Sequence, residues 1–88
     1  MHDASTIEAT IHRLLAERRP GATVCPSEVA RALLPDAQDW RSAMEPVRQV
    51  AGRMADAGRL VVTRGGLPVE ATAPGGPIRL GLPRRHGR

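Results

Sequence analysis

The chain has 88 residues, one cysteine, one aromatic residue and a formal net charge of +4 at pH 7. A chain of this length forms one small domain with one core, so a spacious enclosed active site is not expected. One cysteine cannot form an internal disulfide, and there is neither a signal-like N-terminal segment nor an apolar run of about 18 residues. We therefore expect a cytoplasmic protein that does not enter a membrane.

The positive charge is concentrated at the C-terminal end of the chain. All thirteen basic residues are arginines, and three of them, Arg84, Arg85 and Arg88, follow Pro83. Residues 1–83 contain the other ten arginines and nine acidic residues, so their net charge is only +1. A basic tail can attract nucleic acid, although a solvated terminus that aids solubility is the more common reason for one.

Helical periodicity begins near residue 5. Ser5 and Glu8 match a capping box, in which each side chain accepts a hydrogen bond from the other residue's backbone N–H. The helix is expected to end before Pro20, because proline disfavours the helical conformation of the residue preceding it. The apolar positions that recur with helical spacing are Ile7, Ile11, Leu14 and Leu15.

A second helix is expected to begin at residues 25–28, Cys-Pro-Ser-Glu, after a short β-favouring stretch at residues 22–24. Pro26 suits the first helical turn, where its missing N–H has no partner, and Glu28 places negative charge at the positive end of the helix dipole. Cys25 is the N-cap or its neighbour. Its thiolate could be favoured by the helix start, but a small, buried and unreactive side chain is the more frequent outcome.

The longest amphipathic segment begins at Trp40 and is closed by Gly58, which can adopt the left-handed conformation that ends a helix. Pro46 indicates either a kink or a new helix with this proline in its first turn. Because Trp40 is in phase with the apolar stripe, we expect its ring to anchor the core rather than to stack on a base. The stripe contains Met44, Val47, Ala51 and Met54.

Two stretches near the C-terminus have strand character. Residues 60–63 are β-favouring and end at Gly65-Gly66, and residues 78–82 alternate apolar with other residues, as a half-buried strand does. Residues 67–77 between them are rich in Pro, Gly and Ala, which predicts a long loop or wing.

This order of elements predicts the α+β class and a winged helix-turn-helix fold, with three helices followed by a two- or three-stranded antiparallel β wing. We expect the domain to cover residues 5–82. Residues 83–88 are expected to form a basic, disordered tail.

Several short motifs also bear on the fold. The longest is Cys-Pro-Ser-Glu-Val-Ala-Arg at residues 25–31. The others are Asp39-Trp40-Arg41, Val47-Arg48, Ala57-Gly58-Arg59 and Gly76-Pro77-Ile78-Arg79-Leu80. Together they resemble a small, functionally uncharacterised bacterial family, a domain of unknown function with a predicted winged-helix fold. The resemblance covers residues 7–82 and implies the fold, but it implies no catalytic or binding residue.

The third helix and the wing supply the candidate contacts to nucleic acid. On the helix they are Arg41, Arg48, Gln49 and Arg53, which could reach phosphates and base edges. The others are Arg64 and Arg79 beside the wing and Arg84, Arg85 and Arg88 in the tail. Glu45 and Asp56 lie on the same arc of the helix, so its charge is low for a surface that enters the major groove.

We therefore predict a DNA-binding, regulator-like protein, chiefly by analogy of fold. The alternative is a protein-interaction module on the same scaffold, without DNA binding, which the apolar residues 67–69 favour. The sequence contains no Gly-rich phosphate loop, no Cys/His cluster with zinc spacing and no recognisable nucleophile–His–acid arrangement. We expect no enzymatic activity, catalytic residue, metal or cofactor, and the sequence leaves the oligomeric state open.

Overall fold

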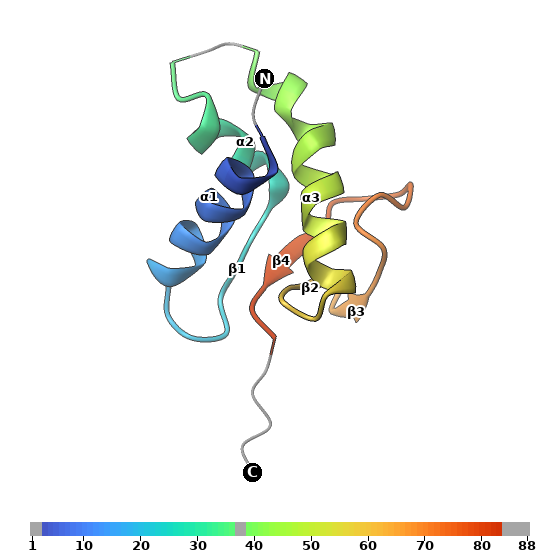
Figure 1. Ribbon diagram of the computed structural model, residues 1–88. Helices are drawn as coiled ribbons and strands as arrows, with labels where there is room; N and C mark the ends of the chain where they lie inside the picture. Colours follow the sequence, from blue (N-terminus) through green and yellow to red (C-terminus); the bar gives the residue numbers. More distant parts are fainter. Residues whose placement is uncertain (1–2, 37–38, 84–88) are drawn as a thin grey trace.

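Three α-helices pack beside a four-stranded antiparallel sheet in the computed structural model, which describes residues 3–36 and 39–83 (Figure 1). The elements are α1 (Ala4–Ala16), β1 (Thr23–Val24), α2 (Pro26–Leu33), the 3₁₀ helix η1 (Trp40–Ala43), α3 (Met44–Asp56), β2 (Val61–Arg64), β3 (Leu67–Pro68) and β4 (Arg79–Gly81). The start of α3 is at the top of Figure 1, and the strands lie toward its other end. No helix within the described residues is long and apolar enough to cross a membrane.

The sheet has the order β1-β4-β2-β3, with every neighbouring pair antiparallel. Leu80 of β4 lies between Val24 of β1 and Val62 of β2, so three buried side chains form one row across the sheet. The last strand is therefore held between the first strand and the strand that follows α3. This winged-helix-like arrangement confirms the predicted α+β class, and β2, β3 and β4 give the three-stranded form of the expected wing.

The start of α1 differs from the prediction. Asp3 is the N-cap: its Oδ1 accepts a hydrogen bond of 2.9 Å from the backbone N–H three residues later. Ser5 and Glu8 both lie inside the helix, so the predicted capping box between them is wrong. Aspartate and serine are about equally favoured as N-caps, and the sequence pattern alone could not choose between two candidates only two residues apart.

The core lies between the inner face of the sheet and the apolar stripes of the three helices. Its fourteen residues are Ile7, Ile11, Leu15, Val24, Val29, Val47, Val50, Ala51, Met54, Leu60, Val62, Ala71, Ile78 and Leu80. The stripes predicted for α1 and for the body of α3 are therefore confirmed, apart from Leu14 and Met44, which are only half-buried.

Trp40 is not part of this core. It lies in η1 with its ring only partly buried, so the prediction that it anchors the core is wrong. The reason is the helix type: a 3₁₀ helix turns by about 120° per residue, so an apolar phase extrapolated at about 100° per residue does not continue through it. Pro46 lies in the first turn of α3, which confirms the second of the two interpretations of this residue.

Two glycine sites shape the connection from α3 into the wing. Gly58 has a φ of 76°, and the N–H groups of Gly58 and Arg59 donate to carbonyls of the last helical turn at 3.0 and 2.8 Å, which closes α3 as predicted. Gly65 and Gly66 have φ values of 60° and 85°, the signature of a tight two-residue hairpin turn. This turn pairs Arg64 with Leu67, so β3 occupies the start of the stretch predicted as a long loop or wing.

Candidate nucleic-acid interface

Arg64 is engaged by the loop that follows β3. Its Nε donates to the carbonyl of Gly76 at 3.1 Å, its Nη1 to that of Pro74 at 3.3 Å and its Nη2 to that of Ala73 at 3.2 Å. Gly75 approaches so closely that a Cβ at this position would lie 2.7 Å from Nη1. The guanidinium therefore holds the wing loop in place, and most of its donors are not free for a ligand.

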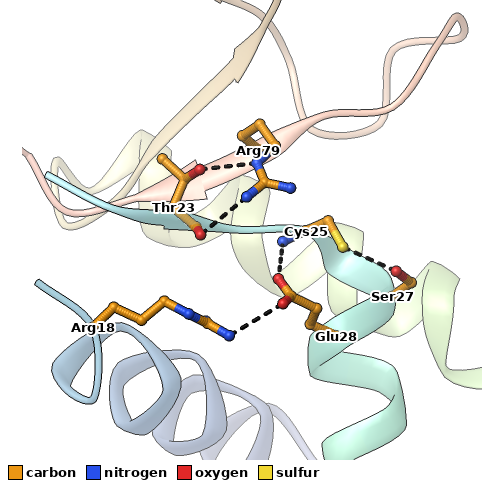
Figure 2. Close-up of polar contacts among 6 residues, drawn as sticks. All are labelled: Arg18, Thr23, Cys25, Ser27, Glu28 and Arg79. Atoms are coloured by element: carbon orange, nitrogen blue, oxygen red, sulfur yellow. Dashed lines mark hydrogen bonds and ion pairs between the residues drawn. The ribbon is translucent and has the colours of Figure 1, made fainter.

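Arg79 is engaged by the neighbouring strand. Its Nε donates to Thr23 Oγ1 at 2.8 Å, and its Nη2 donates to the Thr23 carbonyl at 3.1 Å (Figure 2). This side chain thus fastens β4 to β1. Arg64 and Arg79, the two candidate contacts beside the wing, therefore both have a structural role inside the fold.

The segment that follows Thr23 forms the β1–α2 junction, residues 23–28. The Glu28 carboxylate accepts hydrogen bonds from the Cys25 backbone N–H at 2.8 Å and from Arg18 Nη2 at 3.1 Å (Figure 2). Cys25 is the N-cap of α2, and its Sγ lies 3.0 Å from Ser27 Oγ. The Cys-Pro-Ser-Glu motif is therefore explained by a helix start in which Glu28 satisfies an unpaired backbone donor. Cys25 is half-buried, less than the sequence led us to expect.

The surface of α3 carries less positive charge than the sequence suggested. Its exposed charged and amide positions are Glu45, Gln49, Arg53 and Asp56, which comprise two acids and one arginine. The amide of Gln49 donates to Glu45 Oε2 at 3.2 Å. Arg48 is half-buried, its Nε atom is buried without a hydrogen-bond partner, and it lies about 140° around the helix from Arg53. The two arginines therefore point to different flanks of α3 and do not form one basic face.

Arg31 and Arg41 both lie against the ring of Trp40, although the connection between α2 and α3 separates them along the chain. Their guanidinium carbons lie 4.4 and 4.5 Å from the centroid of the Trp40 ring, which is within the range of a cation–π interaction. We refer to Arg31, Trp40 and Arg41 as the arginine–tryptophan cluster. It forms because η1 packs against α2, whose last turn contains Arg31. Sequence reasoning missed Arg31, since only the folded connection brings it to the ring.

The ion pairs of the described residues lie elsewhere. They are Arg13–Glu17, Arg18–Glu28 and Arg59–Glu8, with distances of 3.4, 3.1 and 3.0 Å. The hydrogen bond from Arg59 and its charge lower the pKa of Glu8, and the same contact raises the pKa of Arg59. Neither Arg31 nor Arg41 is bound to a carboxylate in any of these pairs. Within the part of the chain that the structure describes, the two positive charges of the cluster therefore contact the Trp40 ring and form no ion pair with a carboxylate.

Arg84, Arg85 and Arg88 lie outside the described residues. Within the described ranges, no group of three His, Cys, Asp or Glu side chains could hold a metal ion.

A groove of about 700 Å³ lies on the sheet. Its lining is Pro20, Gly21, Ala22, Thr23, Val61, Thr63, Gly66, Gly81, Leu82 and Pro83, and we call it the outer-face groove.

Comparison with known proteins gives the family. No curated protein matches the sequence. The model of one family, described as a protein of unknown function (DUF3253), matches residues 4–83, which is almost the whole chain. This match agrees with the expectation, drawn from short motifs, of a family without an assigned activity. The chain belongs to the DUF3253 family.

Proposed function

We propose that this domain binds DNA and acts as a small, regulator-like protein. The observation that carries the proposal is the arginine–tryptophan cluster, which presents two guanidinium groups at the start of α3 with no carboxylate bound to either. Guanidinium is the side-chain group best suited to phosphate, because its planar fork can donate two parallel hydrogen bonds to the phosphate oxygens.

The location of the cluster supports the same function. A cation that stacks on an aromatic ring uses the face of the guanidinium, so the N–H groups on its edge remain available to a ligand. Glu45 in the first turn of α3 offsets the positive end of the helix dipole, so the attraction for phosphate at this end comes from the two arginines. In DNA-binding domains built from helix-turn-helix units, the start of the second of the paired helices is commonly the part nearest the DNA, which is an analogy of fold.

The test is a DNA-binding titration at several salt concentrations. Removing one arginine–phosphate interaction should reduce the slope of log affinity against log salt by about 0.9, so the Arg31→Gln/Arg41→Gln variant should show a slope smaller by about 1.8. The matched control is Arg13→Gln/Arg19→Gln, which removes the same charge from exposed positions in and just after α1. Its slope should equal that of the wild type. Equal slopes for all three proteins would exclude the cluster as the DNA contact.

The alternative function is a protein-interaction module without DNA binding. The outer-face groove favours it, because Leu82 at its rim is 55% exposed and Leu67 in the wing is 71% exposed. A second copy of the chain is the first partner to test. If this function is correct, sedimentation equilibrium should show self-association that Leu67→Ser and Leu82→Ser weaken, and the DNA titration should show no binding.

A further inference from the structure

Building on the proposed function, we infer that the domain recognises the phosphodiester backbone of duplex DNA without reading its base sequence, and that Trp40 is a positioning residue for the two arginines that do so. The inference joins two observations. The surface of α3 that would face the bases carries little that could read them, and the cluster carries groups suited to phosphate.

Base reading in the major groove requires donors and acceptors that are free and directed from one helix face. The exposed face of α3 instead carries Glu45 and Asp56, whose charges repel the phosphates on either side of the groove. Gln49, the residue best suited to pair with adenine, already donates to Glu45 at 3.2 Å. Arg48, which could pair with guanine, is half-buried. Arg53 is exposed, but it lies in the last turn of α3, at the other end of the helix from the cluster, and its charge acts on Glu8. The face of α3 therefore offers one arginine for direct readout, beside two acidic residues.

In contrast to the exposed face of α3, the arginine–tryptophan cluster carries groups that are suited to phosphate. Both guanidinium carbons lie within 4.5 Å of the same ring centroid, so they are at most about 9 Å apart and can contact one phosphate or two neighbouring ones. Stacking on Trp40 restricts two long side chains that would otherwise lose rotamer entropy on binding. Phosphate contacts of this kind position a protein on DNA but carry no base information.

The same cluster favours a duplex over a single strand. Proteins that bind single strands without sequence preference stack successive bases on exposed aromatic side chains. Trp40 is the single aromatic residue of this chain, and two guanidinium groups already stack on its ring. The chain has no other Trp, Phe or Tyr ring on which a neighbouring base could stack. Single-stranded DNA should therefore gain only electrostatic attraction, whereas the duplex presents its phosphates in a fixed and dense array.

The first experiment compares DNA ligands with the full chain at one salt concentration. Several duplexes of equal length and unrelated sequence should bind with affinities within about threefold of one another, and a single strand of the same length should bind about tenfold more weakly. A duplex that binds more than about tenfold tighter than the rest, with the preference abolished by Gln49→Ala, would establish base reading and overturn the inference. Equal or tighter binding of the single strand would overturn its duplex part.

The second experiment tests the role of Trp40. Trp40→Phe keeps an aromatic ring under the two arginines and should retain the wild-type salt slope, whereas Trp40→Leu should weaken binding severalfold while circular dichroism and thermal melting show that the protein is folded. A slope and affinity for Trp40→Leu equal to those of the wild type would show that the ring does not position the arginines. Because Trp40 is the sole tryptophan, its fluorescence also reports on the site directly. Duplex DNA should change its emission in the wild type and leave it unchanged in Arg31→Gln/Arg41→Gln.

Failure of this inference can be distinguished from failure of the proposed function. If no duplex binds even at low salt, the proposed function itself is wrong. If duplexes bind with a strong sequence preference, or if binding leaves the Trp40 emission unchanged in the wild type, DNA binding stands and the inference about backbone recognition through the cluster fails.

Discussion

The β1–α2 junction and the arginine–tryptophan cluster use the same residue type for different purposes. At the junction, Arg18 binds a carboxylate and Arg79 binds the neighbouring strand, so their charge and donors are used within the fold. At the cluster, Arg31 and Arg41 touch an aromatic face and retain their edge donors. In a chain whose only basic residues are arginines, the bonding partner of each arginine therefore says more about function than its position in a motif.

The largest effect on stability is expected from Arg64, the most fully engaged arginine in this comparison. Arg64→Ala removes three hydrogen bonds to the carbonyls of the wing loop and should lower the free energy of unfolding by about 1 to 3 kcal/mol, a value already reduced for partial exposure. Urea denaturation measures this decrease. Arg31→Ala is the control and should cost about 0.5 to 1 kcal/mol, the usual contribution of an exposed cation–π contact. Similar decreases for the two variants would remove the distinction between arginines bonded inside the fold and arginines of the cluster.

Trp40→Ala should have an intermediate effect. A tryptophan in a core costs about 3 to 5 kcal/mol when it is truncated, but the partly exposed Trp40 ring should cost about 1 to 2 kcal/mol. The measurement is again urea denaturation, followed by circular dichroism. A cost near 5 kcal/mol would mean that the ring supports the core and would contradict its assignment to a surface cluster.

A somewhat smaller effect is expected at the junction. Glu28→Gln keeps a side-chain acceptor for the Cys25 N–H but removes the charge that binds Arg18 and favours the helix start, and it should cost about 1 kcal/mol. DNA affinity should not decrease, because the substitution removes a negative charge and leaves Arg31, Trp40 and Arg41 in place. If Glu28→Gln weakened DNA binding, the two regions would not be independent.

The smallest effect concerns the ion pair between Glu8 and Arg59, which are 31% and 47% exposed. The Arg59 hydrogen bond holds the pKa of Glu8 below its ordinary value of 4.5. Its stabilisation is therefore present above that value and is lost as the pH falls through the lower pKa of the folded state. Thermal melting should show Glu8→Gln slightly less stable than the wild type at neutral pH, with the difference disappearing as the pH falls below the lowered pKa of Glu8. A difference that grows toward acid pH would contradict this assignment.

The helix boundaries show which parts of the fold local sequence can specify. Gly58 and Pro26 act through their own backbone preferences, so the end of α3 and the start of α2 were predictable. The start of α1 was not, because Asp3 and Ser5 are both good N-caps. Trp40 was misplaced because one apolar phase was extended across a change from a 3₁₀ helix to an α-helix.

The candidate site depended more on tertiary structure than the helices did. Arg41 was identified from the sequence, but its partner Arg31 was not, because a loop separates Arg31 from Trp40 along the chain. Arg64 was predicted to contact DNA because it flanks a wing. Its engagement by three carbonyls depends on the path of residues 73–76, which no local pattern indicates. Charge can be counted in a sequence, but whether it is already paired requires the folded chain.

The most direct test of DNA recognition by the cluster is an NMR titration that observes the arginine side-chain Nε–H groups and the Trp40 indole N–H while duplex DNA is added. We predict that the resonances of Arg31, Arg41 and Trp40 shift at low DNA concentrations, while those of Arg64 and Arg79, already bonded inside the fold, change little. Shifts at Arg64 and Arg79 with none at the cluster would contradict this mode of recognition.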